Sequence, residues 1–435
     1  MKKTFTTLSC IMAAMGITNA QQEFVVSPIE LDGASLSIYA EGMSQNQTYV
    51  VGQDQDSQCP VIWNTQTGDV VILSEKELIV DEEGNTYSED WTGYFHAVNG
   101  QGVAVGDFGA MSVGSHAIMC DVNNPGDYVI LYEEEGDAGN VAYGISEDGK
   151  TVVGFHFDAA WVTHGCVWTD GGEVRTDLPW PTAEECGFDV DYASARGISG
   201  DGSVIMGYAQ ESNFGSWVLI CWKRQADGSY AVNAEGAKKF FEYDYQLGKP
   251  YMTFEPTGLS YNGEWVALTV VEEYDPFDWS YTPMNLAARL NVKSNTLEVL
   301  PGVAANIFSV SDNGTAVGRM TDETFADHGI VWNAGTEELQ QIEDICADEL
   351  ADAMSTSLSA IIGDGTAATG VMMCIEGDVL LQAAFVAQLP VSEAPVGIKD
   401  VQNAVRAEGA YDLMGRRVLN TKGHLIVAGG KLEMR

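Results

Sequence analysis

Short apolar runs alternate with turn-forming residues along most of this 435-residue chain. Between Ala142 and Leu178 the runs are residues 142–146, 151–154, 166–168 and 174–178. Asp148-Gly149 follows the first run and Asp170-Gly171 follows the third. Asp and Gly tolerate the left-handed backbone of tight turns. The pattern predicts a unit of four short antiparallel strands. Such a unit cannot bury both of its apolar faces alone, so further copies must stack against it.

The turn after the first strand recurs seven times, at a spacing of about 51 residues. Its copies are Asn46-Gln47, Asn99-Gly100, Asp148-Gly149, Asp201-Gly202, Asn262-Gly263, Asn313-Gly314 and Asp364-Gly365. The next strand usually ends in Gly, and the third strand carries Trp in four copies, at Trp63, Trp168, Trp222 and Trp332. Because turn, Gly and aromatic residue keep one order, we predict an all-β fold over residues 21–390. It is a seven-bladed β-propeller of four-stranded antiparallel blades.

The seventh copy lacks a Trp and a fourth strand, so six blades with a degenerate flank is the alternative. The segment Phe24–Leu31 also reads as a strand, and its Pro28 suits a sheet edge. We predict that this segment pairs with the strand near 383–388, completes the seventh blade and closes the ring.

The two ends of the chain differ from the repeats. Lys2 and Lys3 precede an apolar run and the small residues Thr18 to Ala20, which is the pattern of a signal peptide over residues 1–20. The run is too short to span a membrane, and we predict no transmembrane segment in the mature chain. Residues 391–435 begin with a Ser/Glu/Pro linker, and the residues after it predict a short C-terminal β module. We expect a monomer that is secreted or held on the outer cell surface.

The formal net charge of the chain is −42. Phosphate contacts need a positive surface, so nucleic acid is excluded as a partner. The charge is typical of a soluble exported protein. Asp54-x-Asp56 and the acids of 272–278 offer oxygen ligands for calcium, but neither matches a defined calcium loop. We therefore predict no cofactor, with calcium left open.

No catalytic residue stands out, because the chain has no Gly-x-Ser-x-Gly elbow and no Cys-x-x-Cys zinc pair. His116, His164 and His328 occupy one repeat position, which indicates a structural role. His156 and His164 could join Asp158 in a metal site. The repeat position favours the structural interpretation, so no metal site is predicted.

Aromatic residues gather in the segments that join second to third strands and one copy to the next. In four-stranded blades these segments share one rim, opposite the tight turns. Exposed rings bury a large area at low entropic cost, and neighbouring acids and amides bind hydroxyls. We predict six ligand-binding residues there: Trp161, Trp217, Tyr274, Phe277, Trp279 and Tyr281. Further rim aromatics are Trp91, Tyr94, Phe155, Phe157, Trp180 and Phe214. The alternative is that these rings pack the long loops onto the blades.

The repeat resembles the HAF-type extracellular repeat, named for a His-Ala-Phe tripeptide before a Trp. That position reads His116-Ala117-Ile118, His164-Gly165-Cys166 and His328-Gly329-Ile330, with each His four residues before the Trp position. The resemblance implies a secreted propeller-like fold. It transfers no catalytic residue, because the family has no agreed reaction.

The tail carries Tyr411-Asp412-Leu413-x-Gly415-Arg416-Arg417-Val418 and a basic last residue. This resembles the C-terminal sorting domain of type IX secretion in Bacteroidota. The resemblance implies contact with the secretion machinery, export across the outer membrane, and surface attachment or release.

Two functional hypotheses follow from these patterns. The first is a non-catalytic binding protein that recognises an extracellular glycan or peptide through the long-loop rim. The second is an extracellular polysaccharide hydrolase or lyase that uses the same face. A binding role is favoured over an enzymatic one, since no catalytic constellation is visible.

Overall fold

The computed structural model describes residues 24–80, 85–186, 188–210, 217–233, 251–253, 256–272, 285–376, 379–390, 425–428 and 431–434. The chain divides into two compact units, residues 1–391 and 392–435. The described part of the second unit is an antiparallel hairpin of β33 (Leu425–Ala428) and β34 (Lys431–Met434). The predicted signal segment lies outside the described residues.

Each of the first four repeats forms one sheet of four antiparallel strands. The first sheet is β4 (Ile38–Met43), β5 (Tyr49–Asp54), β6 (Cys59–Asn64) and β7 (Val70–Ile72). The second is β10 (Thr92–Val98), β11 (Val103–Ala110), β12 (Gly114–Asp121) and β13 (Val129–Ile130). The third is β14 (Gly139–Ile145), β15 (Val152–Phe157), β16 (Thr163–Thr169) and β17 (Val174–Asp177). The fourth is β18 (Tyr192–Ile198), β19 (Val204–Gln210), β20 (Trp217–Arg224) and β21 (Tyr230–Val232).

The fifth and sixth repeats share a composite sheet of eight strands. Its strands are β22 (Tyr251–Thr253), β23 (Gly258–Leu259), β24 (Trp265–Glu272), β25 (Asn285–Asn291), β26 (Thr296–Val310), β27 (Ala316–Thr321), β28 (Asp327–Trp332) and β29 (Leu339–Gln341). The 15-residue strand β26 joins two halves, because residues 296–304 pair with β25 and residues 305–310 pair with β27.

The last repeat forms a closing sheet in the order β1 (Phe24–Val26), β32 (Val379–Gln388), β31 (Ala367–Glu376) and β30 (Ser355–Ile361). As the sequence predicts, the N-terminal strand pairs with the third strand of this repeat, and Phe24 lies opposite Ala387. Only residues 24–26 of the predicted segment 24–31 pair there, whereas residues 30–31 pair with residues 34–35. The rings of Phe24 and Phe385 stack with centroids 5.2 Å apart. The backbone N–H of Ser27 donates to the carbonyl of Ala384 over 2.9 Å. The first strand of the ring thus completes its last sheet.

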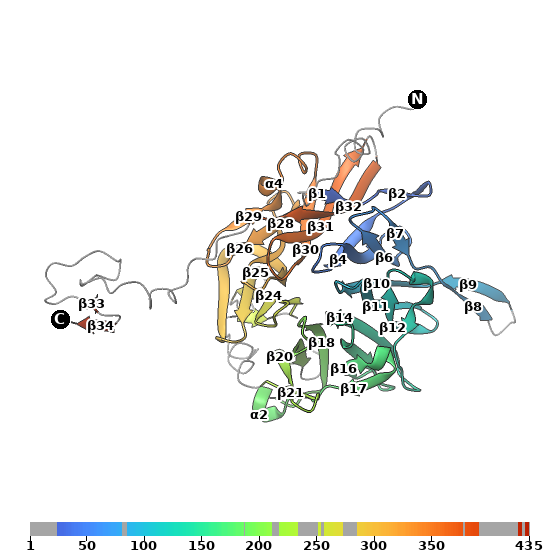
Figure 1. The fold of residues 1–435 in the computed structure, drawn as a ribbon, viewed down its shortest axis with the longest axis horizontal. Helices are drawn as coiled ribbons and strands as arrows, with labels where there is room; N and C mark the ends of the chain where they lie inside the picture. Colours follow the sequence, from blue (N-terminus) through green and yellow to red (C-terminus); the bar gives the residue numbers. More distant parts are fainter. Residues whose placement is uncertain are drawn as a thin grey trace, which may run out of the picture. The chain divides into compact units, whose positions relative to one another are not determined.

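The sheets contact one another in a closed order. β10 packs on β5, β14 on β11 and β12, β18 on β15 and β16, β23 on β18, β30 on β27 and β28, and β4 on β31 and β32. Figure 1 shows β4, β10, β14 and β18 toward the middle, with β7, β17 and β21 at the periphery. Antiparallel sheets stacked around one axis are the architecture of a β-propeller. The all-β propeller fold expected from the repeats is therefore present.

The recurring residues of the repeat build the core between sheets. Trp63, Trp168, Trp222 and Trp332 are each at most 2% exposed. The indole N–H of Trp168 donates to the carbonyl of Tyr132 over 3.0 Å, which satisfies its buried polar atom. The recurring Gly is required by close approach, since a Cβ on Gly154 would lie 2.0 Å from the Val141 carbonyl oxygen.

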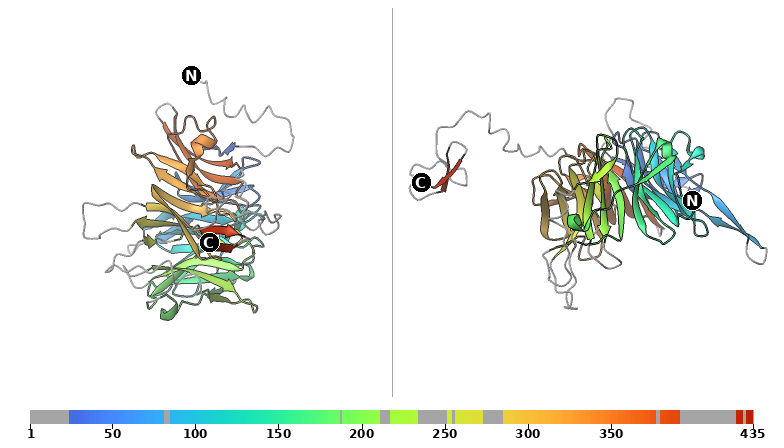
Figure 2. Two further views of the ribbon diagram at one scale, coloured as in Figure 1. Left: turned by 90° about the vertical axis from the view of Figure 1, so that its left-hand side faces the viewer. Right: turned by 90° about the horizontal axis from the view of Figure 1, so that it is seen from below.

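A few elements lie outside the ring of sheets. β2 (Glu30–Leu31) and β3 (Ala34–Ser35) form one short pair, and β8 (Lys76–Val80) and β9 (Thr86–Asp90) form another. Figure 2 shows the β8–β9 hairpin projecting beyond the sheets. The α-helices among the described residues, α2 (Ala183–Cys186) and α4 (Ile342–Ile345), are single turns. Within this part of the chain no helix is long and apolar enough to cross a membrane.

Candidate functional site

The hairpin between β15 and β16 presents an aromatic ring to solvent. The carboxylate of Asp158 accepts hydrogen bonds from the backbone N–H groups of Ala160 and Val162, at 2.8 and 2.9 Å. These bonds hold Trp161 at a φ of 63°, a region that residues other than Gly rarely adopt. The Trp161 side chain is 70% exposed, so it does not serve the core.

Trp161 is the outer end of a continuous row of rings, which we call the aromatic ladder. Its members are Trp161, Phe157, Phe155, Tyr143, His96 and Tyr94. Successive centroids lie 5.8, 5.1, 5.8, 4.5 and 5.9 Å apart. Phe155 and Phe157 share one face of β15 because side chains alternate along a strand. The ladder therefore runs from the rim of the third sheet to the second sheet.

The inner part of the ladder sits on β-bulges. In six repeats the inner strand, which is the first strand of the repeat, contains a β-bulge. The pairing register shifts there, and one residue has no partner opposite it on the second strand. These bulged residues are Glu41, His96, Tyr143, Arg196, Phe308 and Ser359, and all are half-buried. A bulge re-aims a side chain, and bulges are common beside functional sites. Because the inner strands lie toward the middle of the ring (Figure 1), these residues are candidates to line its axis.

Four of the bulged residues form one chain of contacts across four sheets. Glu41 bonds His96, His96 stacks on Tyr143, and the guanidinium carbon of Arg196 lies 4.1 Å from the Tyr143 ring centroid. A cation over an aromatic face is attracted by the ring quadrupole. The contacts of these four residues therefore link the inner strands of the first four sheets.

His96 is held between two carboxylates. Its Nδ1 lies 2.7 Å from Glu41 and its Nε2 lies 2.9 Å from Asp107. Burial alone would lower the pKa of His96, but the hydrogen bonds to Asp107 and Glu41 outweigh it and raise the pKa to about 9. His96 is therefore an imidazolium at neutral pH.

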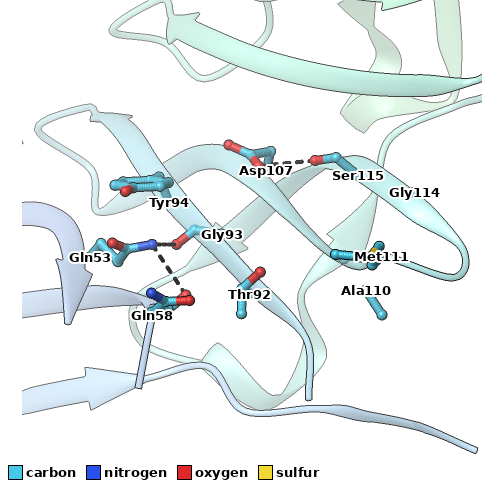
Figure 3. A pocket seen from close by; sticks show the side chains of 11 residues that line it. Gln53, Gln58, Thr92, Gly93, Tyr94, Asp107, Ala110, Met111, Gly114 and Ser115 are labelled. Carbon is cyan, nitrogen blue, oxygen red and sulfur yellow. Dashed lines mark hydrogen bonds between the residues drawn. The ribbon is translucent and has the colours of Figure 1, made fainter. Parts of the chain in front are cut away.

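The ladder ends at a cavity of about 400 Å³ between the first and second sheets. Figure 3 shows Tyr94, Gln53, Thr92, Asp107 and Ser115 among its lining residues. The Gln53 amide donates to the carbonyls of Gly93 and Gln58, at 3.1 and 3.2 Å. The Ser115 hydroxyl donates to Asp107 over 2.9 Å. Burial raises the pKa of Tyr94, which keeps the phenol a hydrogen-bond donor. The cavity therefore combines one aromatic ring, that of Tyr94, with several fixed polar groups.

The six sequence-predicted ligand-binding residues meet different outcomes. Trp161 is exposed on the rim. Trp217 begins β20, but its side chain lies outside the described atoms. Tyr274, Phe277, Trp279 and Tyr281 also lie outside the described residues. Their convergence with Trp161 stays a prediction.

Of the other rim aromatics, Phe214 lies outside the described residues, and the remaining five divide into two groups. Tyr94, Phe155 and Phe157 belong to the aromatic ladder. Trp180 and Trp91 instead stack on His164 and His116, with centroids 5.1 and 5.4 Å apart. For this second pair the alternative interpretation, loop packing, describes the contacts better.

Sequence reasoning missed the bulged residues and Gln53. A signal for the bulges was present, because each bulged residue stands directly before a Gly, Ala or Ser in the repeat, as in Tyr143-Gly144. The position varies strongly while its neighbours recur. No local pattern marks Gln53.

Comparisons with known proteins show no family for this chain. No protein-family model matches this chain, and no curated protein matches it. It is similar to the β-propeller domain of the Trilobed protease from Pyrococcus furiosus, at 12% identity over 83% of this chain and 99% of that one, with a TM-score of 0.43. An oligogalacturonate lyase from Vibrio parahaemolyticus is 10% identical over 85% and 92%, with a TM-score of 0.46. A putative TolB from Agrobacterium tumefaciens is 12% identical over 63% and 87%, with a TM-score of 0.37. None of the activities in these names is carried over to this chain.

Proposed function

We propose that this protein is a secreted or cell-surface β-propeller of seven blades that binds an extracellular glycan without transforming it. The four sheets, the two halves of the composite sheet and the closing sheet support the count of seven. The signal-like residues 1–20 and the sorting-like tail 391–435 support an extracellular ligand. The tail's proposed partner is the secretion machinery.

The aromatic ladder is the observation that carries the proposal. It begins at an exposed ring, Trp161, and ends at the cavity beside Tyr94. Ligand sites combine apolar and aromatic surface with a few fixed polar groups. Here the Gln53 amide, the Ser115 hydroxyl and the Asp107 carboxylate supply those groups. Flat rings suit the apolar faces of sugars, and the polar groups suit their hydroxyls. A glycan therefore fits better than a peptide that binds by strand addition, whose backbone needs an open strand edge.

The carboxylates nearest the ladder favour binding over hydrolysis. A glycosidase needs one carboxylic acid and one carboxylate that both reach the scissile bond. Glu41 and Asp107 instead both bond the His96 imidazolium, at 2.7 and 2.9 Å. Both carboxylates thus share one cationic partner, which is not the arrangement of acid and base that hydrolysis needs.

A glycan array probed with the mature chain tests this function. We expect retention of a restricted set of oligosaccharides, and weaker retention by Trp161→Ala and Tyr94→Phe variants with unchanged circular dichroism. Each retained oligosaccharide is then incubated with the protein and analysed by mass spectrometry. Unchanged oligosaccharide supports a binding protein, whereas cleaved or unsaturated products would establish the hydrolase or lyase alternative. Retention of no glycan would contradict the proposal.

A further inference from the structure

Three chemically matched side chains meet on adjacent strands of the third sheet. His156 of β15 lies directly opposite His164 of β16, and Asp177 ends β17. The Nε2 of His156 is 3.1 Å from a carboxylate oxygen of Asp177. One ligand atom from each of the three residues lies within 4.8 Å of the other two. Because all three come from one sheet, the backbone fixes their spacing.

A buried carboxylate lies beside the Nδ1 of His156, whereas Asp177 lies beside its Nε2. The His156 side chain is 4% exposed, and its Nδ1 lies 3.3 Å from Asp137 without making a hydrogen bond. Asp137 is itself held by Arg175 and by the backbone N–H of Glu134, the latter at 2.9 Å. A carboxylate that accepts the second ring N–H is the usual outer partner of a metal-binding His, and Asp137 lies 3.3 Å from the nitrogen that would donate it.

The repeats show that two of the three residues are additions to the fold. His116, His164 and His328 share one position, so this His belongs to the scaffold. The residue opposite it is Phe108 in the second sheet and Met320 in the composite sheet, but His156 in the third. The position of Asp177, opposite Cys166, corresponds in the composite sheet to that of Gln341, opposite Ile330. The fold therefore does not require His156 or Asp177.

We propose that His156, His164 and Asp177 bind one zinc-type divalent metal ion. Two imidazole nitrogens and one carboxylate oxygen form a donor set that zinc accepts, and three protein ligands leave a position for water or a further ligand. The Asp177 side chain is 52% exposed, which gives the ion a path from solvent. The negative charge of the chain raises the local cation concentration.

Such an ion stiffens the hairpin that carries Trp161. A carboxylate oxygen of Asp158 lies 3.3 Å from His164 Nε2, while the other oxygen caps the turn around Trp161. Fixing His164 therefore also fixes the turn. The metal site itself stands independently of the proposed glycan binding.

Zinc binding by the full mature chain tests the inference. The protein is stripped with EDTA and dialysed against zinc chloride, and bound metal is counted by mass spectrometry. We expect one zinc ion per chain and a zinc-dependent rise in the thermal midpoint. The double variant His156→Met/Asp177→Gln introduces the residue types that Met320 and Gln341 have at the same positions of the composite sheet. We expect it to bind zinc at least 100-fold more weakly than the wild type. His328→Gln, which changes the matching scaffold His, leaves zinc binding unchanged.

Asp177→Asn provides a second variant at a half-exposed position, should the double variant fold poorly. Weakened zinc binding by Asp177→Asn with an unchanged circular dichroism spectrum supports the site. Three results would overturn it: no saturable zinc binding by the wild type, zinc binding by both variants equal to wild type, or calcium bound in preference to zinc.

Discussion

The third and sixth repeats contain the same hairpin, built on β15–β16 and on β27–β28. Asp158 and Asp322 each stand six residues before the recurring His, and each caps its turn through two backbone N–H groups. The residue three positions after each Asp has a positive φ, 63° at Trp161 and 66° at Phe325. Both rings are exposed, Phe325 by 90%. The Asp and the His therefore belong to the hairpin itself.

The two hairpins differ where the chemistry lies. Phe155 and Phe157 of the ladder correspond to Arg319 and Thr321, which both bond Asp327. His156 and Asp177 correspond to Met320 and Gln341, whose side chains lie 3.9 Å apart. The same hairpin backbone thus carries the aromatic ladder and the proposed metal ligands in the third repeat. In the sixth repeat it carries side chains that bond one another. The comparison teaches that recurring residues build the blade, and the variable ones between them set its function.

The largest expected effect comes from moving the donor set. The double variant Met320→His/Gln341→Asp places the residues of the third sheet into the matching positions of the composite sheet. Since His328 and Asp322 are already there, we expect the bound zinc to rise from one ion per chain to two. Dialysis and mass spectrometry measure it. A count that stays at one would show that the outer partner Asp137, which the composite sheet does not reproduce, decides binding.

The ladder predicts unequal roles for two exposed rings. Trp161→Ala is expected to weaken glycan binding about tenfold or more, a loss of at least ~1.4 kcal/mol. Phe325→Ala is the matched control. It removes an exposed ring from the hairpin in which Arg319 and Thr321 replace the ladder residues Phe155 and Phe157, so we expect unchanged glycan binding. Calorimetric titration with an array-selected oligosaccharide measures both. Both variants should change the free energy of unfolding by less than about 0.5 kcal/mol. A loss of ~3–5 kcal/mol in Trp161→Ala would instead identify a packing residue.

The composite-sheet hairpin also predicts a pH dependence. Burial alone would lower the pKa of His328, but hydrogen bonds to Asp322 and Glu343 outweigh it and raise the pKa. A raised folded-state pKa stabilises the protein below the unfolded value, and the stabilisation is lost as pH rises through the folded value. We expect His328→Gln to lower the free energy of unfolding by about 1–2 kcal/mol at pH 6 and by less at pH 9. Urea unfolding at the two pH values checks it. An equal loss at both would show that His328 acts without its charge.

The smallest effect concerns the shared turn. Asn tolerates positive φ better than an aromatic residue does, so Phe325→Asn and Trp161→Asn should each raise the free energy of unfolding by about 0.5 kcal/mol. Only Trp161→Asn should weaken glycan binding. Thermal unfolding and calorimetry separate the two effects. A destabilised Trp161→Asn variant beside a stabilised Phe325→Asn variant would show that the Trp161 ring packs on Phe157.

The sequence determined the elements that depend on neighbouring residues. The backbone conformation of the turn requires residues such as Asp148-Gly149, and close packing requires Gly at position 154. Both can be recognised in the sequence itself. The buried Trp168 follows from its apolar strand in the same way. The strand at Phe24 was also predictable, because the last repeat has no fourth strand of its own. These signals were enough for the all-β propeller fold.

Tertiary structure alone decided which side chains meet. The sequence offered Asp158 as the acidic partner of His156 and His164, but the register of β16 against β17 brings Asp177 into that cluster. Likewise, the bulge at Tyr143 brings its aromatic ring into contact with His96 and Arg196, which come from the two flanking sheets. The contacts of Tyr143 join residues about 50 positions apart, and Asp177 is 21 positions from His156. Their distances depend on strand register and sheet packing, which no local pattern encodes.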